Sequence, residues 1–198
     1  MLGRPLTVVV EHRVLRLPVL LRILFDVPSG KVETAIQMRD AVFDAVIDAD
    51  VLVMSAAVAD FRPAEVAEQK LKKQNSQAQD EQNGLTLRLV RNPDILEELA
   101  HSVDMATGDG GSGRVLIRVG FAAETSNLIA YAREKLVAKR LDLLVANDVS
   151  RADSGFGTDT NKVHIFHANG TMEDLPVMPK TGVAAAVWDR IVSLLSTR

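Results

Sequence analysis

Four short apolar runs, separated by stretches with helical periodicity, constrain the fold of this chain more than any other feature. The runs occupy residues 6–10, 51–54, 115–119 and 143–146. Short runs that are predominantly apolar are typical of strands buried on both faces of a parallel sheet. Because parallel strands require crossover connections, we expect helices between them that pack on both faces of the sheet.

The stretches between the runs carry helix signals. Thr34 is a typical N-cap residue, and Met38, Val42 and Val46 follow it at helical spacing. Strands that alternate with helices in this way predict one α/β domain over residues 1–198. Further helices are predicted by the same criteria at residues 92–100, 126–139 and 183–195.

Four parts of the chain depart from this alternation. Residues 85–90 alternate between apolar and polar side chains, as a half-exposed strand does, and the polar residues 74–84 predict a loop tip. Residues 163–166 and 172–175, joined through an Asn-Gly turn, predict a hairpin. Residues 12–25 show no clear periodicity and receive no assignment. The sequence therefore predicts that the C-terminal part of the domain consists of this hairpin followed by the last helix.

Composition excludes several classes of protein. The formal net charge of -3 argues against a general nucleic-acid-binding protein. The chain has no cysteine, which excludes disulfides, cysteine-ligated zinc and thiol catalysis and fits a cytoplasmic location. No apolar run is long enough to span a bilayer, and the charged residues within 1–22 are atypical of a secretory signal. We therefore expect a cytoplasmic protein that binds small molecules, without a nucleic-acid or membrane partner.

The segment after the strand at 51–54 is the strongest indication of function. Small residues at 55–59 let a ligand approach the backbone, Asp60 adds a carboxylate, and three lysines lie within residues 70–73. In open α/β sheets, ligands bind at the carboxyl ends of strands. Close packing for a base, an acceptor for its donors and cations for phosphates together suggest a nucleotide. The alternative is a buried strand that runs into a solvated basic loop.

Two further segments stand at predicted strand ends. Residues 92–95 open a helix, whose N-terminus suits an anion, although these residues could simply cap the helix. Residues 120–125 again place small side chains after a strand. Phe121 among them could stack on a base or only pack within a tight turn. Two such loops and one helix N-terminus on the same sheet outline a pocket.

Lys135 and Lys139 lie beside the apolar stripe of a predicted helix instead of opposite it. On a helical wheel both fall close to Leu128. Like charges four residues apart repel, and partial burial adds to the cost unless an anion is present. The pair therefore predicts an anion site. The alternative is that the lysine stems lie along the apolar surface and reach water at its edge.

Other site patterns are absent from the sequence. The polar loop at residues 146–161 matches no calcium-binding spacing, so no metal ligands are assigned. The four histidines are scattered and form no catalytic-triad or zinc spacing. Neither the dinucleotide-binding glycine fingerprint nor a P-loop is present, which argues against an oxidoreductase.

Taken in order, these segments resemble the phosphopantothenoylcysteine synthetase (phosphopantothenate–cysteine ligase) family. This family forms the ligase half of the bifunctional coenzyme A biosynthesis protein of many bacteria. Order and spacing agree from about Lys31 to the C-terminus, about four fifths of the chain. The matching pieces are residues 56–63, 70–73, 92–95, 119–125 and 141–149, together with Lys135 and Lys139.

The resemblance implies a Rossmann-like, mostly parallel sheet in a homodimeric ligase. Such an enzyme uses CTP, with Mg²⁺, to convert the carboxylate of 4′-phosphopantothenate into an acyl-cytidylate, with release of pyrophosphate. The amine of cysteine then displaces CMP and gives 4′-phosphopantothenoylcysteine, in coenzyme A biosynthesis. The choice of CTP over ATP rests on the resemblance alone.

The resemblance also implies roles for single residues. Ser55, Ala56 and Asp60 would hold the cytidine part of the nucleotide. Lys70, a catalytic residue in this interpretation, would reach the phosphates from a flap at residues 70–84. The remaining nucleotide-binding residues would be Asn92, Pro93, Asp94, Ile95, Phe121, Lys135 and Lys139.

Residues 1–30 depart from the family pattern. The family begins with a strand, a Gly-rich turn and a helix ahead of the strand matched by residues 6–10, and we find no counterpart of them here. We therefore expect an N-terminally truncated member. Two hypotheses stay open, an active ligase and a catalytically impaired nucleotide-binding module. The flavin-dependent decarboxylase domain often fused upstream is not in this sequence, so no flavin is expected. A homodimer is expected, with residues 70–84 and 85–90 near its interface.

Overall fold

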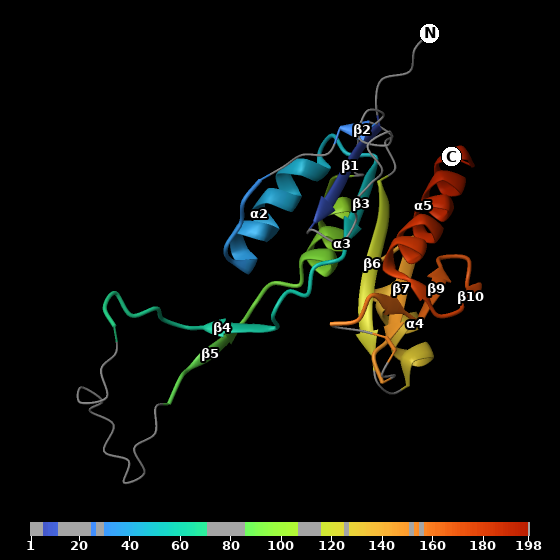
Figure 1. Ribbon diagram of the computed structural model, residues 1–198. Helices are drawn as coiled ribbons and strands as arrows, with labels where there is room; N and C mark the ends of the chain where they lie inside the picture. Colours follow the sequence, from blue (N-terminus) through green and yellow to red (C-terminus); the bar gives the residue numbers. More distant parts are fainter. Residues whose placement is uncertain are drawn as a thin grey trace.

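A seven-stranded sheet with the order β10-β9-β7-β6-β3-β1-β2 forms the centre of the molecule (Figure 1). The computed structural model describes residues 6–11, 25–26, 30–70, 86–106, 116–124, 127–150, 153–154 and 157–197. The strands of the sheet are β1 (Leu6–Glu11), β2 (Phe25–Asp26), β3 (Val51–Met54), β6 (Ile117–Glu124), β7 (Leu143–Asp148), β9 (Val163–His167) and β10 (Met172–Asp174). The helices are α2 (Ala35–Val46), α3 (Ile95–Ala106), α4 (Leu128–Ala138) and α5 (Lys180–Ser196).

The sheet is mostly parallel, as the apolar runs predicted. β2, β1, β3, β6 and β7 pair in parallel, whereas β9 runs antiparallel to β7 and β10 antiparallel to β9. The β9–β10 connection is the predicted hairpin. Gly170 in it has φ of +88°, which a side chain would strain. The predicted fold class is confirmed.

Helices cover both faces of the sheet. α2, α3 and α4 pack on one face, and α5 packs on the other. β3 shows this division, because Leu52 contributes to the core beneath α2, α3 and α4, while Val51 and Val53 contribute to the core beneath α5. Burial on both faces explains the continuous apolar run of this strand. In the described ranges no helix is both long and apolar enough to cross a membrane.

α2 begins after the predicted N-cap. The Gln37 backbone N donates to Thr34 Oγ1 at 3.1 Å, and the Thr34 backbone N donates to Gln37 Oε1 at 3.1 Å. This reciprocal capping box satisfies two amides that would otherwise lack a partner. The position of Thr34 at the start of the helix is confirmed.

β6 extends further than predicted and includes residues that the sequence placed in a loop. Phe121 pairs with Val145, so the ladder to β7 continues beyond residue 119. Gly120 lies inside this strand, where a Cβ would be 2.7 Å from Leu141 Cδ1. Packing between β6 and Leu141 therefore favours a very small residue here, whether or not a ligand binds, because a Cβ would force the Leu141 side chain to shift.

A two-stranded arm extends away from the central sheet (Figure 1). β4 (Phe61–Pro63) pairs antiparallel with β5 (Leu89–Arg91), and β4 was not predicted. The strand predicted at 85–90 is shorter in the structure and begins later, although residue 85 lies outside the described residues. The polar stretch 74–84 also lies outside them. A separate pair is formed by β8 (Thr160–Asn161) and β11 (Met178–Pro179).

Candidate functional site

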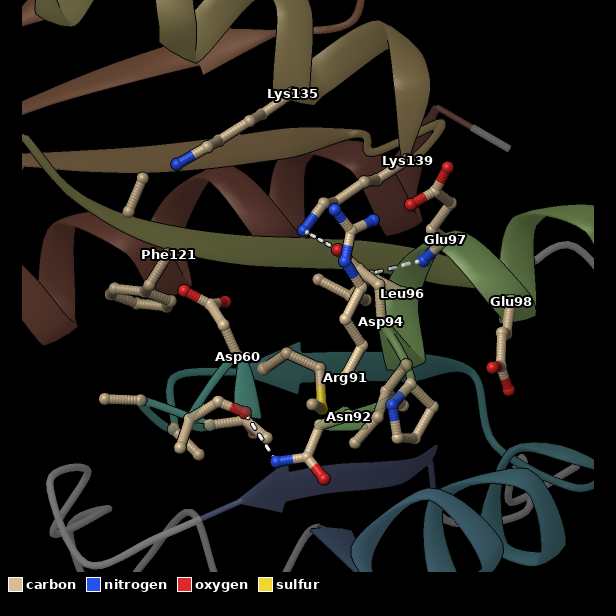
Figure 2. Close-up of a pocket in the computed structure, with 18 of the residues that line it drawn as sticks. Asp60, Arg91, Asn92, Asp94, Leu96, Glu97, Glu98, Phe121, Lys135 and Lys139 are labelled. Carbon is tan, nitrogen blue, oxygen red and sulfur yellow. Dashed lines mark hydrogen bonds and ion pairs between the residues drawn. The ribbon is translucent and has the colours of Figure 1, made fainter. Parts of the chain in front are cut away.

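A cavity of about 1080 Å³ lies at the carboxyl ends of β3 and β6 (Figure 2). The three segments that the sequence placed at strand ends meet here, together with Lys135 of α4 and Lys139 at the C-cap of that helix. The volume suits a nucleotide-sized ligand, since ligand pockets typically measure about 300–1,000 Å³. The described wall consists of residues 56–61, 91–98 and 121–123, with Phe43, Met54, His101, Ser102, Lys135 and Lys139.

Asn92 joins two walls of the cavity. Its Nδ2 donates to the Ala59 carbonyl at 2.7 Å, and its backbone N donates to the Asp60 carbonyl at 2.8 Å. Its Oδ1 accepts from Arg62 Nη1 at 3.1 Å. These bonds hold the small-residue segment against the N-terminus of α3. The side chain of Asn92 thus shapes the cavity, and the side-chain cap of α3 comes from Asp94.

Asp94 connects the N-terminus of α3 with α4 (Figure 2). Its Oδ1 accepts from the Glu97 backbone N at 3.1 Å, which is the capping role that the sequence predicted. Its Oδ2 lies 2.7 Å from Lys139 Nζ. The Lys139 side chain is only 24% exposed, so a carboxylate of the protein orients this ammonium group at the cavity. The ion pair was not foreseen, because its members lie far apart in the sequence.

Lys135, Phe121 and Asp60 line another part of the cavity. Figure 2 shows Lys135 reaching from α4, with the Phe121 ring and the Asp60 carboxylate on the opposite side of the space. Phe121 is 36% exposed, so a ligand can contact its ring. An aromatic ring, a carboxylate and an ammonium group can contact a base, its donors and a phosphate.

Two of the predicted site residues do not line the cavity. Ser55 directly follows β3 and is half-buried, but it is not part of the described wall. Lys70 is exposed and lies beyond β4, outside the wall. Within one copy of the protein, neither side chain lines the cavity, so this position does not support the roles predicted for them.

The described wall also contains residues that the sequence did not single out. Arg91 had a usable signal, because it directly precedes Asn92 at the end of a predicted strand. The other polar ones lie on α3 and have the pattern of an ordinary exposed helix face, so only the fold brings them to the cavity. They are Glu97, Glu98, His101 and Ser102.

The charge of the described wall is nearly balanced. Three cationic and four carboxylate side chains line it. A polyanion therefore meets no excess of positive charge there and binds better with a cation of its own. Among the described residues, no three His, Asp or Glu side chains form a group that could hold a metal ion. Because Mg²⁺ is often held by one or two carboxylates and by phosphates of the substrate, the wall suits a metal that arrives with its ligand.

A second charged cluster lies on the β9–β10 hairpin, outside the cavity. Arg190 Nη2 donates to Glu173 Oε2 at 2.6 Å, and His167 Nε2 lies 2.7 Å from Glu173 Oε1. The hydrogen bond from Arg190 is the main cause that lowers the pKa of Glu173 to about 2, and His167 contributes. Since Arg190 belongs to α5, this cluster fastens the hairpin to the helix.

Comparison with known proteins identifies the class to which this chain belongs. Residues 13–195 match the family model described as the DNA/pantothenate metabolism flavoprotein C-terminal domain. The chain is a member of this family, which confirms the resemblance seen in the sequence.

The individual relatives are coenzyme A biosynthesis bifunctional proteins CoaBC. That of Bacillus subtilis is 42% identical over 174 residues, which cover 85% of this chain and 39% of that protein. That of Escherichia coli K12 is 40% identical over 162 residues, which cover 82% of this chain and 36% of that protein. The chain thus spans about two fifths of the length of these relatives.

Solved structures agree with the fold. The crystal structure of the C-terminal domain of a CoaBC protein superposes with a TM-score of 0.62 at 28% identity, covering 87% of this chain and 68% of that one. The DNA/pantothenate metabolism flavoprotein from Streptococcus pneumoniae superposes with a TM-score of 0.60, covering 86% of this chain and 73% of that one. At 18% identity, this second likeness supports the fold alone.

Proposed function

We propose that this chain is a phosphopantothenate–cysteine ligase of coenzyme A biosynthesis and uses CTP. One observation carries the proposal. Asp60, Phe121, Lys135 and the N-terminus of α3 come from separate parts of the chain and line a single cavity. Membership of the family whose CoaBC members are named for coenzyme A biosynthesis supports the choice of reaction.

The cytidine part of the nucleotide is assigned to the wall formed by Ala56, Asp60 and Phe121. The small residues allow close approach to the backbone, the ring can stack on the base, and the carboxylate can accept from an amino or hydroxyl group. Ser55 is adjacent to this wall in the sequence. We keep Ser55 as a candidate. Because it does not line the cavity, it would act by holding the backbone of the neighbouring residue Ala56, which does.

The phosphates are assigned to the N-terminus of α3, which Asn92, Pro93, Asp94 and Ile95 form, and to the ammonium groups of α4. Backbone amides and the helix dipole favour an anion at such an end. Lys135 and Lys139 add charge from the facing helix. For Lys70 to act on the phosphates, as the resemblance implies, its arm must approach the cavity when ligand binds, or the arm of a second subunit must do so.

The proposed reaction has two steps. A carboxylate oxygen of 4′-phosphopantothenate attacks the α-phosphorus of CTP, and pyrophosphate leaves with the electron pair of the broken P–O bond. The cysteine nitrogen then attacks the acyl carbon and loses a proton. The acyl C–O bond breaks, and CMP leaves with its electron pair. Cationic side chains fixed at the phosphates stabilise the charge that develops on them in the first step. Mg²⁺, bound as part of the nucleotide substrate, would neutralise further phosphate charge.

A homodimer is part of the proposal. The arm carries large apolar side chains in the open: Phe61, Leu87 and Leu89 are 52%, 59% and 53% exposed. Two-stranded ribbons are marginally stable by themselves, and grouped exposed apolar side chains commonly mark an interface. A second copy of the chain would cover them. Sedimentation as a monomer at micromolar concentration would contradict this assignment.

Pyrophosphate release tests the function directly. The chain, with Mg²⁺ and CTP, should release pyrophosphate only when 4′-phosphopantothenate is added, and should then consume cysteine. Arg133→Ala removes an exposed cation from α4 that does not line the cavity, so it should leave the rate unchanged and serves as the control. Binding of CTP without pyrophosphate release would favour the impaired nucleotide-binding module. A melting temperature that rises with NAD and not with CTP would exclude both hypotheses.

A further inference from the structure

We propose that Arg91 is a further phosphate-binding residue of the cavity, opposite the lysines of α4. This inference rests on the proposed function, because it names the part of the site that recognises the phosphates of the nucleotide. Arg91 lines the cavity from β5, whereas Lys135 lines it from α4 and Lys139 from the C-cap of that helix. Figure 2 shows its guanidinium pointing from the strand toward the region of Asp94 and Lys139.

The backbone of Arg91 is held in place on three sides. Arg91 pairs with Phe61 in the ladder between β4 and β5. Its carbonyl accepts from Arg62 Nη1 at 2.6 Å, and the next residue, Asn92, is bonded to Ala59 and Asp60. The Cα of Arg91 is therefore held in place at the rim of the cavity. When a ligand binds, only the side-chain torsions of Arg91 have to become ordered.

The charge around Arg91 makes it available to an anion. Lys139 already shares its charge with Asp94 at 2.7 Å. Arg91 is exposed, and among the described residues its guanidinium forms no ion pair. A guanidinium presents a planar fork of donors that matches two phosphate oxygens, which an ammonium group cannot do. Arg91 therefore adds directional recognition to a cavity whose other cations are lysines.

The alternative is that Arg91 is an ordinary solvated residue at the end of a short strand. Arg88 provides a matched control, because it lies on the same arm, is exposed and does not line the cavity. Its carbonyl accepts from the Ala64 backbone N, and a substitution by alanine leaves this bond possible. Arg88→Ala and Arg91→Ala thus remove the same charge three residues apart.

The test compares three ligands on the full chain by calorimetry: CTP with Mg²⁺, cytidine, and inorganic tripolyphosphate. Arg91→Ala should weaken CTP and tripolyphosphate by about tenfold to a hundredfold, because a hydrogen bond to a charged group is lost, and should change cytidine by less than about twofold. Arg91→Lys should recover only part of the affinity, since it restores charge without the fork. Arg88→Ala should leave all three ligands within about twofold.

Three results would overturn the inference. Equal losses for CTP and cytidine would mean that Arg91 shapes the cavity, and equal losses from Arg88→Ala would mean that only overall charge matters. Unchanged tripolyphosphate affinity in Arg91→Ala would also contradict it, and Arg91→Lys decides the case if the alanine variant does not fold. If the native chain binds tripolyphosphate but not CTP, the proposed function fails while Arg91 is still judged on tripolyphosphate. If it binds neither, both fail.

Discussion

The cavity and the β9–β10 hairpin both contain charged side chains, but the two regions use them differently. On the hairpin, Glu173 bonds both Arg190 and His167, and each of these groups has its partner within the protein. At the cavity, Lys139 is held by Asp94, while Arg91 has no ion pair among the described residues. In the hairpin cluster the charged groups pair with one another, whereas at the cavity the guanidinium of Arg91 is available to a ligand.

The difference shows how ion pairs of similar length can serve different ends. A cluster whose charged groups are all paired holds one element against another, and a ligand adds no interaction to it. A partly satisfied cluster at the carboxyl ends of parallel strands lies where open α/β sheets bind ligands, and a ligand can complete it. We therefore expect substitutions on the α5 side to change stability alone and substitutions at the cavity to change binding alone.

The largest expected effect is on the α5 side. Ile191→Ala should lower the free energy of unfolding by about 2–4 kcal/mol, because Ile191 is 1% exposed and its removal leaves a cavity in the core. Val192→Ala is the control, since Val192 is 44% exposed, and it should change stability by less than about 0.5 kcal/mol. Urea unfolding measures both. A loss of CTP affinity in the folded Ile191→Ala protein would break the separation between the two regions.

At the cavity, Lys135→Ala should weaken CTP by about tenfold to a hundredfold through the loss of a charged contact to phosphate. Cytidine affinity should change by less than about twofold, because cytidine has no phosphate. Titration calorimetry with both ligands, beside the Arg133→Ala control, measures the difference. If both ligands lose affinity equally, Lys135 supports the fold of the wall and does not bind phosphate.

The smallest expected effect concerns the hairpin cluster. The pKa of Glu173 is lowered to about 2 from its ordinary value of 4.5, so its carboxylate stabilises the folded state above about pH 4.5 and loses this contribution as the pH falls toward 2. Glu173→Gln should therefore lower the free energy of unfolding by about 1 kcal/mol at pH 7 and by less at pH 3. Urea unfolding at both pH values tests this. A larger loss at pH 3 than at pH 7 would have the wrong sign.

Much of the fold could be predicted from the sequence because its signals are local. The apolar runs at β3 and β7, the Thr34 cap and the Asn-Gly turn each depend on a few adjacent residues. The extension of β6 through Phe121 could not be predicted, because small residues such as Gly120 disfavour a strand by themselves. Pairing with β7 and packing against Leu141 decide that this segment continues the sheet.

The candidate site was predictable in its parts and not in its arrangement. The sequence indicated Asp60, Phe121 and Lys135, because a strand end or a position beside an apolar stripe is visible in the order of residues. Arg91 was not singled out. Ser55 and Lys70 were indicated by their places in a small-residue segment and a lysine cluster after a strand, and the resemblance gave each its individual role. The structure does not place the side chains of these last two in the cavity.

The sequence by itself determined the class of fold, the family and the segments that carry polar chemistry, because each depends on the type and spacing of nearby residues. Only the tertiary structure decided which cations have partners. The ion pair of Lys139 with Asp94 joins two helices, and the exposed position of Arg91 depends on the pairing of β4 with β5. An ion pair depends on the distance between charges in space, and the order of residues does not specify distances between segments far apart in the chain.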